Sequence, residues 1–150
     1  MSGDSRAKVL PPPVGARGIF SRTITQSDIT LYAGLTGDFA PHHVDAEFGR
    51  RTRFGGTIAH GLFTASLVDG ALAALFPRGS LSARRELRFT SPVRPGDTIT
   101  AIAEVAEVDA KGRTVTLTTT CTNQRGEAVV TGTATERIMA SNPEVSADRP

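Results

Sequence analysis

All three histidines of this 150-residue chain lie close to one aspartate in a loop-rich stretch. The segment GDFAPHHVD (residues 37–45) carries Asp38 and His43 five positions apart across a proline, and His60 directly precedes Gly61. A carboxylate and an imidazole at this spacing can both point at one water molecule, and such a pair supplies a general acid and a general base near neutral pH. The stretch therefore predicts proton-transfer chemistry.

Taken alone, each of these residues also has a structural interpretation. Asp38 could simply form a turn, His43 could be a hydrogen-bonded loop histidine, and His60 could pack or hydrogen-bond at the start of a helix. Asp45 is expected to cap a short helix over residues 46–51. A zinc site is not expected, because His42 and His43 are adjacent rather than one helical turn apart.

Composition excludes several classes of protein. With one cysteine there is no intramolecular disulfide and no cysteine-based zinc cluster, so Cys121 is predicted to be a small core residue and a reducing cytoplasm is the expected compartment. The first 15 residues lack the apolar core of a signal peptide, and no apolar run reaches the length of a membrane span. Nucleic-acid binding is not expected, because 15 acidic residues are interspersed with the basic ones and only 5% of residues are aromatic.

The basic residues are unusual, because 15 of the 17 are arginine. Arginine binds phosphate well through its planar fork of donors, so a small anionic ligand stays open beside the simpler interpretation of solvated surfaces.

The chain divides into two tails and one body. Residues 1–16 include three consecutive prolines and are expected to be an extended or disordered lead-in, and residues 140–150 are expected to form a flexible tail. Residues 17–139 contain no repeat and no linker, so they are predicted to form a single domain.

The second half of the body has the pattern of an antiparallel sheet. Apolar and polar residues alternate over 85–90, 98–105, 115–121 and 128–138, with glycine-containing turns at 109–112 and 123–126. A further strand is predicted over 18–23.

The first half supplies the helices. Thr25 is placed to cap a short helix over residues 26–35 that ends at Gly37, with Asp28 three positions after the cap. A longer helix runs from about His60 to Phe76 and is apolar around nearly its whole circumference, which is typical of a buried helix. The sequence thus predicts an α+β fold in which a sheet wraps a central helix.

Three segments carry a resemblance to a known family. GDFAPHHVD, FGGTIAHG (residues 54–61) and the junction FTSPVRPGD (residues 89–97) resemble signatures of the MaoC-like family of R-specific enoyl-CoA hydratases. The resemblance extends from about Thr23 to Ile138 and implies the hotdog fold, an antiparallel sheet wrapped around one long helix.

The resemblance also implies an activity. Asp38 and His43 match the family's catalytic pair, and Gly61 matches the glycine whose backbone N–H binds the thioester oxygen, a role that suits a helix N-terminus. The implied reaction is reversible hydration of a trans-2-enoyl-CoA to the (R)-3-hydroxyacyl-CoA, with the coenzyme A thioester as substrate and no further cofactor or metal. Acyl carrier protein stays open as the carrier. A hotdog thioesterase and a non-catalytic acyl-thioester-binding module are the alternatives.

Substrate contacts are expected mainly around the same loop and along the long helix. Ala40 departs from the family pattern, which has asparagine there, and this puts rate and substrate range in doubt more than reaction type. Asp69 either lines the substrate tunnel or pairs with an arginine. The candidate substrate-binding residues are Ala40, Pro41, Ile58, His60, Leu62, Asp69, Arg84 and Arg85, and the arginines that could meet coenzyme A phosphates are Arg50, Arg51, Arg53, Arg84, Arg85 and Arg88.

Proteins of this fold normally pair two units edge to edge, so a homodimer is expected.

Overall fold

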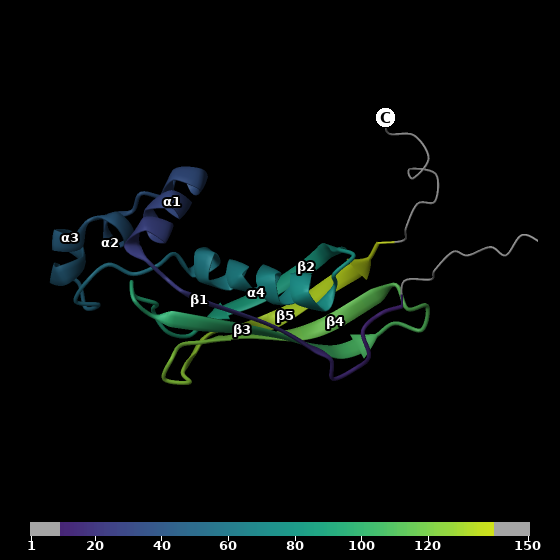
Figure 1. Ribbon diagram of the computed structural model, residues 1–150. Helices are drawn as coiled ribbons and strands as arrows, with labels where there is room; N and C mark the ends of the chain where they lie inside the picture. The colour runs from purple at the N-terminus through teal and green to yellow at the C-terminus, as the bar shows by residue number, and fades with distance from the viewer. Residues whose placement is uncertain (1–9, 140–150) are drawn as a thin grey trace, which may run out of the picture.

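One antiparallel sheet wraps one side of a 15-residue helix in the computed structural model, which describes residues 10–139 (Figure 1). The strand order in the sheet is β1-β3-β4-β5-β2, so β1 and β2 form its edges. This architecture confirms the predicted α+β fold with a central helix. In chain order the elements are β1 (Arg17–Thr23), α1 (Gln26–Thr36), α2 (Pro41–Val44), α3 (Ala46–Arg51), α4 (Gly61–Leu75), β2 (Ser80–Phe89), β3 (Thr98–Val108), β4 (Thr114–Thr122) and β5 (Ala128–Ile138).

The core lies between α4 and the concave face of the sheet. Alternate residues of β3 and β4 are buried, as the sequence alternation predicts. They meet a face of α4 that includes Val68, Ala71 and Leu72, all nearly or fully buried. Each fully buried aliphatic side chain contributes about 1.5–3 kcal/mol. The buried strand residues are Ile99, Ala101, Ala103, Val105, Val115, Leu117 and Cys121.

Strand β1 crosses α4 at very close range. A Cβ built on Gly18 would lie 1.9 Å from the backbone oxygen of Ala71, so a larger residue fits there only if the strand or the helix moves. The ring of Phe20 similarly fills the space next to Gly70, where a Cβ would lie 2.6 Å from Cγ of the ring. Small residues at the crossing therefore set the distance between helix and sheet.

The helix ends follow the sequence signals. The Thr25 side chain accepts a hydrogen bond from the backbone N–H of Asp28, the Asp28 carboxylate accepts from the backbone of Thr25, and Gly37 ends α1 in the left-handed conformation at φ 78°. Asp45 caps α3 by accepting from two backbone N–H groups. These caps confirm the predicted starts of both helices.

Two expectations were wrong. Helix α4 is buried on one side only, with Leu62, Ser66 and Asp69 on an exposed side, because a single sheet covers one face of the helix. Strand β2 begins at Ser80 rather than at residue 85. Its first half, SLSAR, lacks a buried apolar alternation, and its pairing is with the end of β5.

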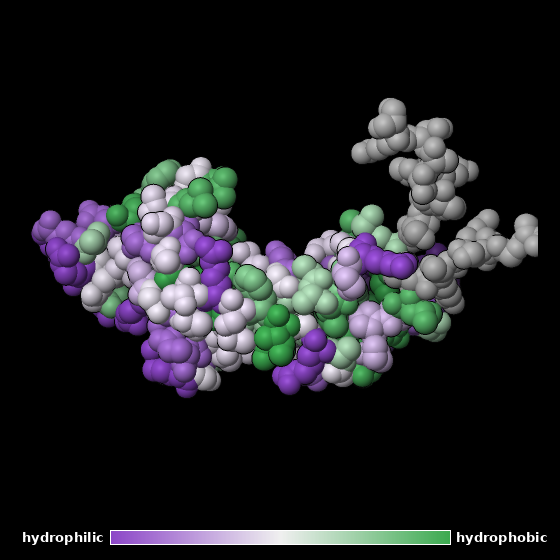
Figure 2. Space-filling view, viewed as in Figure 1, coloured by the Kyte–Doolittle hydropathy of each residue, from purple (hydrophilic) through white to green (hydrophobic). Residues whose placement is uncertain are grey.

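The remaining described segments complete the surface. Within residues 10–16, Gly15 donates a backbone hydrogen bond to Val105 of β3; residues 1–9 and the C-terminal tail at 140–150 lie outside the described residues. No helix among residues 10–139 is long and apolar enough to cross a membrane. Apolar side chains gather on the outer side of α1, where Leu31 and Leu35 are largely exposed (Figure 2).

Candidate active site

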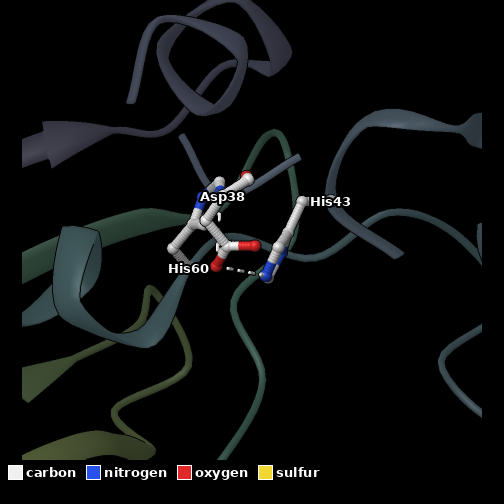
Figure 3. A group of neighbouring side chains, drawn as sticks. All are labelled: Asp38, His43 and His60. Atoms are coloured by element: carbon white, nitrogen blue, oxygen red, sulfur yellow. Dashed lines mark hydrogen bonds and ion pairs between the residues drawn. The ribbon is translucent and has the colours of Figure 1, made fainter. Parts of the chain in front are cut away.

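The loop after α1 places Asp38 at the centre of the site. The left-handed turn at Gly37 ends the helix, and Asp38 follows it in a segment without regular structure. Its Oδ1 accepts the backbone N–H of Ala40 at 3.2 Å, which leaves Oδ2 facing His43 and His60 (Figure 3). The Asp38 carboxylate is about half exposed, so it remains open to a ligand.

His43, on α2, is held in a defined tautomer. Its Nδ1 lies 2.7 Å from the carbonyl oxygen of Ile58, which can only accept, so Nδ1 carries the proton. The free lone pair is therefore on Nε2, which lies 3.8 Å from Oδ2 of Asp38. This separation is too long for a direct hydrogen bond and short enough for one water to contact both atoms.

Burial lowers the pKa of His43 below its ordinary value. The imidazoles of His60 and His42 also lower the pKa, while the Ile58 carbonyl and the Asp38 carboxylate act in the opposite direction without reversing it. His43 is consequently neutral at pH 7, with an unprotonated Nε2 that can accept a proton.

His60, the residue before α4, connects the two sides of the site. Its ring stacks on His43 with centroids 3.7 Å apart and contacts the ring of Tyr32 from α1. Its Nε2 donates to the backbone oxygen of Asp38 at 2.9 Å. The side chain is almost fully buried.

Asp38, His43 and His60 also bring three potential metal ligands together, with ligand atoms within 4.8 Å of one another. The ring geometry does not suit an ion. A metal bound to imidazole lies in the plane of the ring along the nitrogen lone pair, and two rings stacked at 25° cannot both direct Nε2 at one ion. In addition, Nε2 of His60 is occupied by its bond to Asp38.

A cavity of about 690 Å³ opens above these residues, a size typical of small-molecule sites. The first residue of α4, Gly61, forms one wall, and Phe89 at the end of β2 faces it. The N–H groups of the first turn of a helix have no acceptor inside the helix and lie at its positive end. The cavity thus combines a basic imidazole, a carboxylate and a group of donors suited to a developing negative charge.

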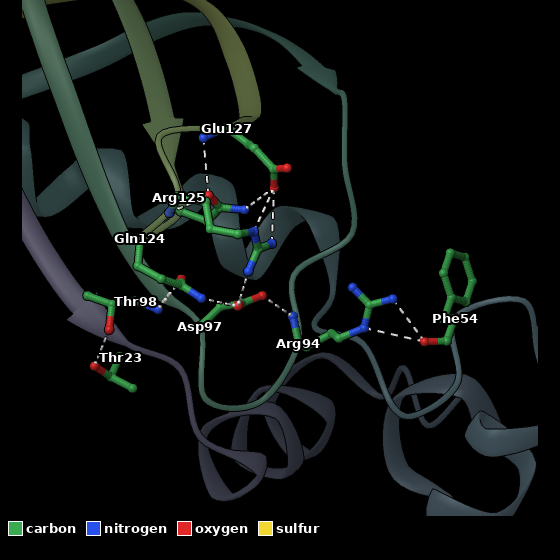
Figure 4. Close-up of polar contacts among 9 residues, drawn as sticks. Thr23, Phe54, Arg94, Asp97, Thr98, Gln124, Arg125 and Glu127 are labelled. Atoms are coloured by element: carbon green, nitrogen blue, oxygen red, sulfur yellow. Dashed lines mark hydrogen bonds and ion pairs between the residues drawn. The ribbon is translucent and has the colours of Figure 1, made fainter.

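A polar network centred on Asp97 joins the loop before β3 to the turn between β4 and β5 (Figure 4). The buried Asp97 carboxylate accepts the backbone N–H of Arg94 and the side chain of Gln124, each at 2.8 Å. Burial acts to raise the pKa of Asp97, yet these hydrogen bonds and the nearby Arg125 hold it below its ordinary value. Arg94 in turn donates to the backbone oxygen of Phe54, which lines the cavity.

Several residues expected at the site do line the cavity. Asp38, His43 and Gly61 come together there, and Ile58, His60 and Leu62 form parts of its wall. Ala40 contributes its backbone N–H to Asp38, and Pro41 is the exposed first residue of α2.

The charged candidates farther along α4 lie elsewhere. Asp69 and Arg85 form an ion pair at 3.0 Å and line a second hollow, which shares Leu62 with the main cavity. Arg85 also pairs with the buried Glu136 at 3.0 Å. Arg84 is exposed and pairs with Glu86, its neighbour two residues along β2.

Sequence reasoning assigned no role at the site to Tyr32, Phe89 or Val130, which also line the cavity, although Phe89 begins the FTSPVRPGD junction. Tyr32 is the only tyrosine of the chain and lies on the short capped helix, which was a usable signal. Phe89 and Val130 lie on neighbouring strands, paired in register, and only the sheet topology shows that they meet the start of α4.

The fold and the site together place Asp38 and His43 beside a cavity that also reaches the start of the central helix α4, and known proteins have similar sequences. Residues 14–126 match the family model described as "MaoC like domain". An (R)-specific enoyl-CoA hydratase of Rhodospirillum rubrum is 37% identical over 127 residues, which cover 84% of this chain and 88% of that protein. A 3-hydroxybutyryl-CoA dehydratase of Methylorubrum extorquens is 37% identical over 126 residues, 83% of this chain and 80% of that protein.

Among solved structures, an (R)-hydratase from A. caviae involved in PHA biosynthesis superposes with a TM-score of 0.81 at 34% identity, covering 85% of this chain and 98% of that one. The chain belongs to the MaoC-like domain family and has its hotdog fold. The resemblance seen in the three sequence segments is thereby confirmed.

Proposed function

We propose that this chain catalyses the reversible hydration of a trans-2-enoyl-CoA to the (R)-3-hydroxyacyl-CoA. The observation that carries the proposal is the placement of Asp38 Oδ2 and the unprotonated His43 Nε2, 3.8 Å apart, in a cavity bounded by the first residue of α4. The relatives named as hydratase and dehydratase support the same reaction read in its two directions.

In the hydration direction, a water molecule contacts both His43 Nε2 and Asp38 Oδ2. Nε2 takes a proton from the water as the water oxygen bonds to Cβ of the enoyl group. The electron pair of the C=C bond moves to the thioester oxygen, where the N–H of Gly61 stabilises the resulting enolate. His43 then delivers this proton to Cα as the enolate collapses back to the thioester, and the nearby Asp38 carboxylate stabilises the imidazolium in between. No cofactor is needed.

The test is a spectrophotometric assay with crotonyl-CoA. The purified protein should bleach the ultraviolet band of the enoyl thioester without releasing free thiol, and an (R)-specific 3-hydroxyacyl-CoA dehydrogenase should oxidise the product. Asp38→Asn should lower kcat by about 100-fold or more, in the range for loss of an acid–base group. Asp45→Asn is the matched control, because it removes a carboxylate of the same segment while asparagine still caps α3.

Other outcomes identify the alternatives. Release of thiol with the enoyl band unchanged would indicate a thioesterase. Binding of crotonyl-CoA without either signal, unaltered by Asp38→Asn, would indicate a binding module. Parallel assays with crotonyl groups on acyl carrier protein, and with longer acyl chains, define the carrier and the chain length.

Arg53, which lines the cavity, is our candidate for a coenzyme A phosphate contact. Arg53→Gln should raise KM for crotonyl-CoA more than KM for crotonyl-pantetheine.

A homodimer is part of the proposal. Strand β2 pairs only with β5 among the described strands, so its other edge presents unpaired backbone groups. Leu81 and Phe89 of β2 and Leu62 of α4 are more than half exposed, which gives this edge an apolar surface. We propose that a second copy lies along β2, and sedimentation of the wild type and of Leu81→Arg is the test.

The buried single cysteine suits a reducing compartment, and we propose the cytoplasm.

A further inference from the structure

The backbone at Asp38 is held by few contacts. The segment from Gly37 to Ala40 lies between helices, and the Asp38 carboxylate is too far from either histidine for a direct hydrogen bond. Among residues 10–139, the N–H of Asp38 reaches Thr36 Oγ1 at 3.4 Å, and Oδ1 accepts from Ala40 at 3.2 Å. The bond from His60 Nε2 to the Asp38 carbonyl, at 2.9 Å, is the shortest of the three.

His60 makes a second contact that bears on the reaction. Its ring stacks on the buried imidazole of His43, with ring centroids 3.7 Å apart. The same residue therefore contacts the Asp38 main chain through its edge and His43 through its face. It is also the N-cap residue of α4, directly before Gly61.

The other nitrogen of His60 shows that packing alone does not account for this residue. Because the Asp38 carbonyl can only accept, Nε2 carries a proton, and Nδ1 is a buried polar atom without a partner among the described residues. An unpaired buried polar atom is destabilising, and an apolar residue would avoid that cost. The donor at Nε2 is the property that an apolar residue would lack.

We propose that His60 is a positioning residue, which ties the main chain of Asp38 to the start of α4 and holds His43 against it, so that carboxylate, imidazole and Gly61 N–H keep one geometry. This inference rests on the proposed hydratase function for its kinetic consequence. The reacting groups remain Asp38, His43 and Gly61.

Two amide substitutions distinguish the hydrogen bond from His60 to the Asp38 carbonyl from simple packing of the side chain. The side-chain nitrogen of glutamine reaches the place of histidine Nε2, whereas that of asparagine is one methylene shorter and reaches only the place of Nδ1. His60→Asn should lower kcat for crotonyl-CoA hydration by about 10- to 100-fold, with KM changed by less than about 3-fold, because a displacement of about 1 Å can cost that much. His60→Gln should keep kcat within a few-fold of the wild type.

The pH profile gives a second readout. The groups that face His43 are Asp38, His42, His60 and, around the cavity, Tyr32 and Arg53. Burial and the His60 ring both lower the pKa of His43, so either substitution should move the acid limb of kcat/KM to higher pH. A loss of folded protein would lower the activity without moving the limb.

Hydrogen exchange of the Ala40 amide gives a readout independent of activity. Since this N–H bonds to Asp38, its exchange should be faster than in the wild type in His60→Asn and close to the wild-type rate in His60→Gln. Equal kinetics in the two variants, or unchanged exchange in His60→Asn, would overturn the inference. If the wild type does not hydrate crotonyl-CoA, the proposed function fails and exchange still decides the role of His60. If His60→Asn does not fold, His60→Phe keeps a buried ring without the donor, and the same loss of kcat is expected.

Discussion

Replacing Gly61 with alanine probes the wall of the cavity where the thioester oxygen is proposed to bind. A Cβ at this position would lie 2.9 Å from both Cδ1 and Cε1 of Phe89. Carbon atoms in ordinary contact are about 3.5–4.0 Å apart, so the ring or the first turn of α4 must move by about 0.6–1 Å. Because Phe89 is half exposed, its ring can move without unfolding the protein.

The expected result is a loss of activity without a loss of stability. A shift of about 1 Å at the reacting centre lowers kcat/KM by about 10- to 100-fold, which corresponds to about 1.4–2.7 kcal/mol of transition-state stabilisation. Alanine favours helix over glycine by up to about 1 kcal/mol, so the free energy of unfolding should not fall. Crotonyl-CoA kinetics and urea denaturation measure the two quantities.

Two controls decide whether the ring is the cause. Gly56→Ala makes the same change in the same segment, where a Cβ meets nothing within 4 Å, and it should leave kcat/KM unaltered. Phe89→Leu combined with Gly61→Ala should recover most of the activity relative to Phe89→Leu alone, because the smaller side chain frees the space and the Gly61 N–H is kept. A Gly61→Ala enzyme with wild-type kcat/KM, or a double variant without recovery, would refute this account.

Three further predictions concern other parts of the molecule. Because burial lowers the pKa of His43, the acid limb of kcat/KM should lie below pH 6.5. The unfolded chain binds this proton more readily than the folded protein, so the free energy of unfolding should fall as the pH drops below about 6.5. Denaturation series from pH 5 to 8 measure this dependence, and His43→Gln should lose the part that His43 contributes. Burial raises the pKa of Cys121 to about 11, so a thiol reagent at pH 8 should leave the folded protein unlabelled and label it after unfolding; rapid labelling of the native state would contradict the placement of this residue. Gly18→Ala should lower the free energy of unfolding by about 1–3 kcal/mol, because its Cβ would lie 1.9 Å from the Ala71 oxygen; Gly34→Ala, on an open side of α1, is the control, and equal stability of the two variants would contradict the close crossing.

Local patterns determined most of the elements. Capping by Thr25 and Asp45 set the starts of two helices, and alternation set the faces of β3 and β4, since each depends only on neighbours a few residues apart. Strand β2 was recognised only in part, because the segment from Ser80 to Arg84 is stabilised by pairing with β5 at the far end of the chain. Apolar periodicity likewise could not show that only one side of α4 is covered.

The sequence by itself determined which residue types are available for chemistry here: Asp38 and His43 are near in the chain, and their spacing, together with the family resemblance of the segments around them, predicts an acid–base pair. Only the tertiary structure decided the state and the surroundings of that pair. The Ile58 carbonyl fixes the His43 tautomer from 15 residues away, His60 binds the Asp38 main chain from 22 residues away, and Phe89 closes the cavity from a strand beyond α4. The physical reason is that burial, proton placement and cavity shape depend on atoms brought together by packing, and no local pattern of residues specifies them.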